Sequence, residues 1–335
     1  MIKKVGSVFL GAVFALTLSA CSESEESNTS KLRVASWSQP ITEQINLLVD
    51  DQGFFAKKNI ELEFIPGAGG GDAIKNIASG KADIAFTDPG SFFAALDKGE
   101  KLIALYDIYP HNVFNVVSLK QSNITAPEDL KGKKIGVYSL SSGTRQNLLV
   151  LLKQAGLTEE DVEIIPTGVL NFAPLMQGLV DATAATDTGL ATGKAKGLGE
   201  VDIIQVKDHF NYSSDLFVVT EAIYQQKPDE LGAFLAGYKK SVQWMLDNPE
   251  KAAQLAVKHA IDGKDQAHNL TLIKLRNAAS TPLSGDLAEL GLIDFTNLQK
   301  AADMYYELGL IGQPLDLTRA VNHGSVLNQE LETSQ

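Results

Sequence analysis

The sequence predicts an α/β protein of two lobes, each a mostly parallel sheet flanked by helices, joined by a two-strand hinge. Its 335 residues exceed what one small core needs and match the usual size of two packed domains. Strand and helix patterns alternate in two successive β-α-β-α-β runs. Two further strand-like segments, 113–120 and 216–223, stand outside these runs. The simplest topology places them side by side as the hinge.

Composition excludes several classes of function. The hydrophobic share is 44% and the charged share 21%, as in ordinary soluble globular proteins. The formal net charge of −12 argues against a nucleic-acid partner, because phosphate binding requires clustered Lys and Arg. A single cysteine leaves no intrachain disulfide and no Cys-based zinc cluster. We expect no metal and no cofactor.

The N-terminus is typical of an exported protein. A basic start precedes an apolar stretch from Val5 to Leu18, which is too short to span a bilayer. Small residues then lead directly to Cys21, as in the lipobox of bacterial lipoproteins; the alternative is a plain signal peptide with a chance cysteine. We therefore predict a signal peptide over residues 1–20, lipidation of Cys21, and a flexible tether over 21–31.

The first run begins after the tether. Its apolar spacing predicts strands and helices in alternation, with Gly53 and Gly99 as helix stops. The expected strands are 32–37, 60–66, 82–88 and 101–108, and the expected helices are 42–57, 72–79 and 89–99.

The second run repeats this pattern, and the chain then becomes helical. We expect strands at 133–139, 162–168 and 181–187, with helices at 144–154 and 171–178. A continuous apolar stripe from Leu231 to Leu246 predicts a helix that packs back on the first lobe. The predicted domains are lobe 1 over 32–115 and 220–335, and lobe 2 over 116–219.

Ligands of open α/β sheets bind at the carboxyl ends of strands, so the loops there are the candidate site. These loops are rich in Gly, Ser, Thr and amides, which suit a small polar ligand held by backbone and hydroxyl donors. Among them, Ser141–Arg145 (SSGTR) stands at a helix start, where it could form an anion nest with Arg145 as a forked donor. The alternative is a simple Ser/Thr cap with Arg145 in water.

Aromatic and acidic residues in the same loops suggest other ligand contacts. Trp37 and Phe172 could stack on a ligand, although both could equally be core residues. Asp88 and Asp187 could pair with an amine or a ring N–H of a ligand, or could instead stabilise turns by accepting hydrogen bonds from the backbone. The glycine-rich loop 67–72 lacks the ending of a phosphate-binding motif, and the histidines lack metal or catalytic spacing.

Five stretches in order resemble the periplasmic solute-binding proteins of ABC importers for sulfonates, nitrate, taurine and thiamine precursors. They are Gln52–Phe64, Gly80–Asp88, Pro127–Val137, Ser141–Leu157 and Leu175–Ala182. The resemblance implies a type II periplasmic-binding-protein-like fold. It also implies ligand contacts at Ser36, Trp37, Gln39, Gly69, Gly70, Thr87, Asp88, Ser141, Ser142, Gly143 and Thr144.

Two departures concern ligand identity. Where members of that family often carry Trp-Asp-Pro-Tyr, this chain has Thr186-Asp187-Thr188-Gly189, and the cysteine run of pyrimidine-synthesising relatives is absent. The implied function is capture of a solute between the lobes and its delivery to an ABC permease by a lipid-anchored, monomeric protein. A receptor for a membrane sensor and a pyrimidine-forming enzyme are the alternatives. A sulfonate-like anion fits Arg145 and a pyrimidine-like ring fits Trp37 and Phe172; the sequence slightly favours the anion.

Overall fold

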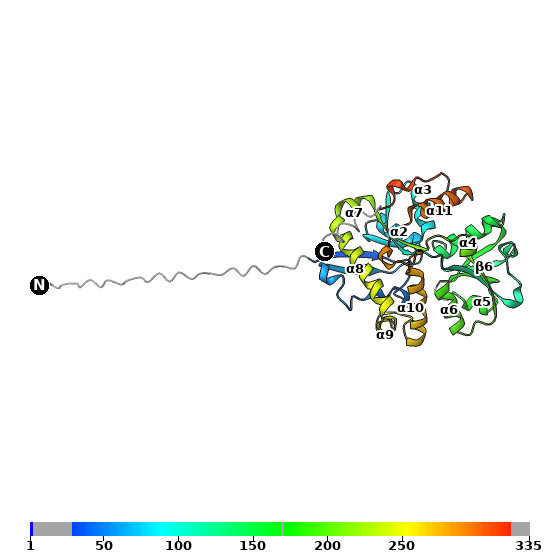
Figure 1. Cartoon of the computed structure of the whole chain (residues 1–335), viewed down its shortest axis with the longest axis horizontal. Helices are drawn as coiled ribbons and strands as arrows, with labels where there is room; N and C mark the ends of the chain where they lie inside the picture. The colour runs from blue at the N-terminus through cyan, green and yellow to red at the C-terminus, as the bar shows by residue number, and fades with distance from the viewer. Residues whose placement is uncertain (3–28, 169–170, 323–335) are drawn as a thin grey trace.

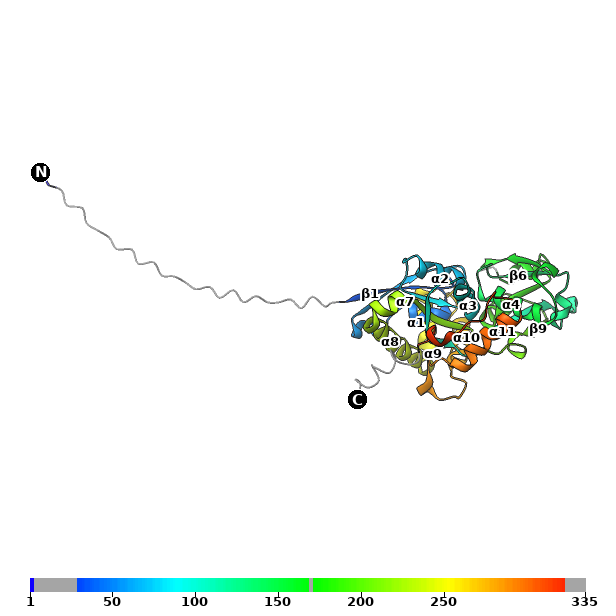
Figure 2. The ribbon, with the colours of Figure 1, turned by 90° about the horizontal axis from the view of Figure 1, so that it is seen from above.

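The chain folds around two five-stranded mixed sheets (Figures 1 and 2). This computed structural model describes residues 1–2, 29–168 and 171–322, so the predicted signal peptide and Cys21 lie outside the described residues. The strand order is β2-β1-β3-β10-β4 in one sheet and β7-β6-β8-β5-β9 in the other. We call the halves built on these sheets lobe 1 and lobe 2. The two-lobed α/β prediction is confirmed.

Lobe 1 is assembled from both ends of the described chain. Its strands are β1 (Ser30–Ala35), β2 (Ile60–Ile65), β3 (Ile84–Thr87), β4 (Leu102–Tyr109) and β10 (Asp215–Thr220). Strands β1, β2 and β3 run parallel, and β10 is inserted antiparallel between β3 and β4. Its helices are α1 (Ile45–Leu48), α2 (Gly70–Ala78), α3 (Pro89–Asp97), α7 (Glu221–Gln226), α8 (Pro228–Asp247), α9 (Pro249–His259), α10 (Gln266–Ser280) and α11 (Phe295–Glu307).

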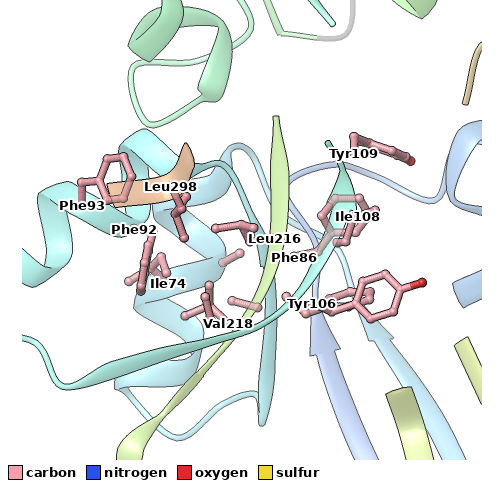
Figure 3. Close-up of a cluster of buried hydrophobic side chains, with 14 of the residues drawn as sticks. Ile74, Phe86, Phe92, Phe93, Tyr106, Ile108, Tyr109, Leu216, Val218 and Leu298 are labelled. Carbon is pink, nitrogen blue, oxygen red and sulfur yellow. The ribbon is translucent and has the colours of Figure 1, made fainter. Parts of the chain in front are cut away.

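The core of lobe 1 lies on both faces of this sheet. On one face, Figure 3 shows Leu216 of β10 beside side chains from α2, α3 and α11. On the other face, Phe217 packs edge-on against Phe234 of α8, with ring centroids 5.1 Å apart. The sheet is buried on both faces, so β3 and β4 are apolar almost throughout instead of alternating. The apolar stripe of α8 therefore packs on lobe 1, as its spacing predicts.

Lobe 2 repeats the arrangement with fewer helices. Its strands are β5 (Phe114–Leu119), β6 (Lys134–Val137), β7 (Glu163–Pro166), β8 (Ala182–Thr186) and β9 (Val201–Gln205). Its helices are α4 (Gly143–Gln154), α5 (Ala173–Met176) and α6 (Asp187–Ala195). Strands β6, β7 and β8 are parallel, and β5 is antiparallel to both β8 and β9. Each sheet thus has one reversed strand, next to its edge strand.

The two segments expected to form a side-by-side hinge lie in different sheets. Strand β5 pairs with β8 and β9, whereas β10 pairs with β3 and β4. The chain passes between the sheets at 110–113 and 211–214. There Ser214 N donates to Tyr109 O at 2.8 Å, and Ser214 Oγ donates to His111 O at 2.6 Å. We propose that the lobe boundaries lie at these crossings, because each flanking strand is fixed by its own sheet.

Two predicted helices are shorter than expected. In the segment 42–57 the first helix ends at Leu48 and only a short 3-10 helix follows, at Ala56–Lys58. The Asp50 carboxylate interrupts the helix because it accepts hydrogen bonds from the backbone of Phe54, Phe55 and Ala56. The helix expected over 171–178 is reduced to α5, and Asn171 has a left-handed φ of 42°. Helix α6 and strand β9 were not predicted. Within the described part of the chain, no helix has the length and apolarity needed to cross a bilayer.

Candidate functional site

Two adjoining cavities lie between the lobes. The inner pocket holds about 30 Å³ and is lined by Trp37, Gly69, Asp88, Phe114, Tyr138, Ser142, Gly143, Thr144, Thr186, Asp215 and Arg276. The outer chamber holds about 630 Å³; residues of both lobes line it, among them Gln39, Ile41, Phe172, Ala173, Met176, Ile261 and Leu272. Trp37, Tyr138, Thr144 and Thr186 line both cavities, so the two form one continuous site.

The lobes touch on two sides of this site. On one side, Gly71 N donates to Ser141 O at 2.9 Å, and Ser141 Oγ donates to Ala68 O at 3.2 Å. This approach requires a glycine at position 69, whose φ is 133° and where a Cβ would lie 2.5 Å from Ser141 O. On the other side, Thr192 of α6 and His268 of α10 are hydrogen bonded at 3.1 Å. The structure is therefore a closed form.

Two buried carboxyl groups face the inner pocket. Asp88 caps α3: its Oδ1 accepts from Ser91 N at 2.8 Å and its Oδ2 from Ser91 Oγ at 2.7 Å. Burial raises the pKa of Asp88 to about 6. Asp215 is 5% exposed, and among the described residues no donor contacts its carboxyl group. Burial, together with the nearby acids Asp88 and Glu43, raises the pKa of Asp215 well above its usual range.

The buried cation of the site is Arg276 of α10, which is 1% exposed. Its guanidinium forms ion pairs with Glu43 (Nε to Oε2, 3.3 Å) and with Asp187, and it lies 4.9 Å from the centre of the Tyr109 ring. Burial raises the pKa of Glu43, and Arg276 opposes that rise. Two carboxylates therefore already compensate the Arg276 charge.

Arg145 differs from its expected role. Its guanidinium bonds Glu159 through Nε at 3.2 Å and through Nη2 at 2.5 Å, and it lines neither cavity. The hydroxyls of its loop are also occupied, because Ser142 Oγ donates to Ser139 O at 2.6 Å and lies 2.7 Å from Thr144 Oγ1. The pairing of Arg145 with an acid fourteen positions later removes it from the site.

The other sequence candidates divide into two groups. Those lining the cavities are Trp37, Gln39, Gly69, Asp88, Ser142, Gly143, Thr144 and Phe172. The other six lie elsewhere. Ser36 is hydrogen bonded to Gln44, and Gly70 and Thr87 pack against Asp88. Ser141 bridges the lobes, and Arg145 and Asp187 form ion pairs. The sequence reasoning missed Glu43, Tyr138, Asp215 and Arg276. One signal was present: Arg276 follows Leu272 and Ile273 at helical spacing, a cation within an apolar face.

Aromatic rings form the walls where the two cavities join. Trp37 lies edge-on to Tyr138 of lobe 2 and to Phe86 of lobe 1, at centroid distances of 6.0 and 6.3 Å. The buried Nε1 of Trp37 has no hydrogen-bond partner among the described residues. Within the same part of the chain, no cluster of three or more His, Cys, Asp or Glu side chains could hold a metal ion. The site thus offers aromatic walls, buried acceptors and, among the described residues, unused N–H donors on Trp37 and on the Arg276 guanidinium.

Sequence comparison finds relatives of several kinds. The chain is 25% identical over 274 residues (81% of this chain, 84% of the relative) to a Haemophilus influenzae protein whose name assigns it provisionally to thiamine biosynthesis. It is 21% identical over 250 residues (71% and 75%) to the formylaminopyrimidine-binding protein of Halalkalibacterium halodurans. It is also 25% identical over 236 residues (66% and 67%) to the Saccharomyces cerevisiae 4-amino-5-hydroxymethyl-2-methylpyrimidine phosphate synthase THI5.

Solved structures share the fold at low identity. The periplasmic aliphatic sulphonate binding protein SsuA of Escherichia coli has a TM-score of 0.66 at 18% identity, covering 89% of this chain and 99% of its own. The Candida albicans CA3427 gene product, with the generic periplasmic binding protein fold, has a TM-score of 0.64 at 19% identity, covering 88% and 96%. The NMT1/THI5-like family profile matches residues 44–252, more than half of the sequence. The chain therefore belongs to the NMT1/THI5-like family.

Proposed function

We propose that this protein is an extracytoplasmic, lipid-anchored solute-binding protein of an ABC importer, and that its solute is a nitrogen heterocycle of the thiamine-precursor type. The observation that carries the ligand class is Asp215, a buried carboxyl group without a donor that faces the inner pocket beside Asp88. A buried acceptor of this kind is costly unless a ligand supplies N–H groups to it. An amino-substituted ring carries such N–H groups along one edge.

The charge around the pocket argues against the sulfonate-like anion that the sequence slightly favours. Arg145 is paired with Glu159, and the Arg276 charge is compensated by Glu43 and Asp187. A sulfonate in the inner pocket would meet Asp88 and Asp215 without an uncompensated cation to offset them. An N–H donor or a cation is instead stabilised by the ionised form of either carboxyl group.

The aromatic walls support the same choice. A flat ring placed at the junction of the cavities would contact Trp37 and Tyr138, which come from different lobes. Such a ligand favours the closed arrangement because the open one cannot offer both contacts at once. The formylaminopyrimidine-binding relative takes a ligand of this chemistry, as its name states.

Binding is proposed in preference to catalysis, although the synthase THI5 is a relative. The only cysteine of the chain is Cys21, so the cysteine run of pyrimidine-synthesising relatives has no counterpart. His111 and His268 are engaged by Thr281 O and Thr192 Oγ1, and neither lines a cavity. Release of any product from a bound aminopyrimidine would overturn the binding assignment.

Titration calorimetry on the purified full chain tests the ligand class. The probes are 4-amino-5-hydroxymethyl-2-methylpyrimidine, ethanesulfonate and taurine, each added to the same preparation. We expect saturable binding of the aminopyrimidine and none of ethanesulfonate. Binding of ethanesulfonate with no heat from the aminopyrimidine would refute the heterocycle assignment and restore the anion.

A further inference from the structure

We infer that the solute has two parts: a donor-bearing ring edge held in the inner pocket, and a bulky apolar substituent that occupies the outer chamber. This inference rests on the proposed function, since it takes the heterocycle as the part that enters the inner pocket. It adds that an unsubstituted or short-chain heterocycle is not the preferred ligand.

The two cavities differ greatly in size, so they accept different parts of a ligand. The inner pocket, at about 30 Å³, has room for roughly two waters, each needing ~10–15 Å³, and so accepts an amino group or a ring edge. The outer chamber, at about 630 Å³, lies within the ~300–1,000 Å³ range of pockets for drug-sized ligands. A single small ring would leave most of the outer chamber filled with water.

The outer chamber is also fixed in size in this closed form. Backbone and side-chain contacts already join the lobes on both sides of it, at Ser141 and Gly71 and at Thr188 and Glu43. Further approach of the lobes is therefore blocked by atoms in contact. The space is a feature of the closed protein and is not a gap that ligand-driven closure would remove.

The position of Phe172 in the wall of the outer chamber depends on its packing against α6. Phe172 is 3% exposed and lies against Gly193 of α6, where a Cβ would come within 2.8 Å of the ring. The missing side chain at Gly193 lets Phe172 sit back against α6 and leaves the chamber clear. Any larger residue at 193 would push the ring into that space.

The lining shows the chemistry of the occupant. Ile41, Ile261 and Leu272 of lobe 1 oppose Phe172, Ala173 and Met176 of lobe 2 across the chamber. Met176 and Ile261 remain 42% and 59% exposed even in the closed form. Large apolar side chains that stay in contact with water on two facing walls gain free energy when an apolar group covers them. The part of the occupant that contacts these two walls is therefore apolar, aliphatic or aromatic.

The test is a ligand series measured by calorimetry on the purified full chain. A 4-aminopyrimidine is extended at carbon 5 from methyl to butyl and to benzyl, with the donor edge unchanged. We expect affinity to rise by roughly two- to fourfold for each methylene that enters the chamber. Equal or weaker binding of the extended ligands, with the methyl compound still bound, would overturn the two-part ligand and leave the proposed function intact.

Two variants test whether the apolar substituent binds in the outer chamber. Met176→Trp and Ile261→Trp fill the chamber from opposite lobes, so each should remove most of the benzyl-over-methyl affinity ratio. Leu179→Trp is the matched control, because Leu179 follows α5 and is 60% exposed but lines neither cavity. The ratio should persist in Leu179→Trp. A ratio unchanged in both chamber variants would place the substituent elsewhere, and loss of binding for the whole series in the wild type would refute both proposals.

Discussion

The hydroxyl of Thr188 in lobe 2 donates a hydrogen bond of 2.8 Å to the buried carboxylate of Glu43 in lobe 1. The same carboxylate pairs with Arg276, which in turn reaches Asp187 at the start of α6 (Figure 1). These four residues join the lobes in this closed form. The free energy of closure, and hence ligand affinity, depends on them.

Replacing Thr188 by Val should weaken ligand binding by about 1–2 kcal/mol, because the closed form loses a hydrogen bond to a charged group. Calorimetry with the aminopyrimidine measures the change. Thr271→Val is the control, since the Thr271 hydroxyl bonds only the backbone of its own helix, at Ala267 O. Equal affinity in Thr188→Val and the wild type would show that this contact does not contribute to closure.

Asp215→Asn should lower ligand affinity at least tenfold and at the same time raise the melting temperature of the ligand-free protein. Affinity falls because an ionised acceptor is lost, whereas stability rises because an unpartnered buried carboxyl group is removed. Asp208→Asn, at an exposed position, should change neither. A melting temperature that drops together with affinity would indicate a structural role for Asp215 instead.

Stability should depend on pH through Asp88. Its pKa is raised from 3.8 to about 6 in the folded protein, so the folded state holds the proton more tightly than the unfolded one. This contribution is complete below pH 4 and is lost as the pH rises to about 6, a change of roughly 3 kcal/mol at ~1.36 kcal/mol per pKa unit.

Chemical unfolding between pH 4 and 7 checks this dependence. Asp88→Asn keeps an acceptor for Ser91 N and should flatten the fall in unfolding free energy over that range. Asp107, whose burial raises its pKa to about 7, remains and lowers the unfolding free energy over the same range, so Asp88→Asn should reduce the fall below about pH 6 without abolishing it. Identical slopes in wild type and Asp88→Asn would contradict the assignment.

Arg145→Ala should leave ligand affinity unchanged and cost at most about 1 kcal/mol of stability, because it removes a partly exposed pair with Glu159. Arg276→Ala should cost about 3–5 kcal/mol of stability, since it leaves the buried Glu43 without its partner. Calorimetry and thermal unfolding of both variants check the contrast. Weakened binding in Arg145→Ala alone would return Arg145 to the site.

Cys21→Ser should shift the protein from the membrane pellet to the soluble fraction, because acyl chains on Cys21 are the proposed anchor and each buried methylene contributes ~0.8 kcal/mol. Centrifugation of cell extracts without detergent measures the shift, and Ser24→Ala serves as the control. Continued sedimentation of Cys21→Ser with membranes would refute the anchor.

Local pattern was sufficient for most of the architecture. Period-two and helical spacing, together with Pro and Gly at helix ends, predict nine of the ten strands that the structure describes, because those signals depend on neighbours in sequence. The same reasoning failed at 42–57, where the side chain of Asp50 competes for backbone donors and ends the helix. It also failed at the hinge, because strand pairing between β10 and β3 joins residues far apart in the chain.

Loop position predicted half of the site. Trp37, Asp88, Gly143 and Thr144 follow strands whose carboxyl ends meet at the cleft, and this rule of α/β sheets does not depend on side-chain detail. Arg145 stands in the same first turn of α4 as Gly143, yet its side chain turns to Glu159. The direction of a long, flexible side chain depends on which opposite charge comes nearest in the folded chain.

By itself, the sequence determined a two-lobed α/β protein with a polar and aromatic cleft, because composition, periodicity and strand-end loops are local properties. Only the tertiary structure decided the charge of that cleft. Glu43, Asp215 and Arg276 come from three distant segments, and packing brings them to the same buried volume. Burial then raises the pKa of Asp215, since a low-dielectric interior penalises the ionised carboxylate. That arrangement, and not the presence of an arginine in a loop, defines which solute chemistry the site favours.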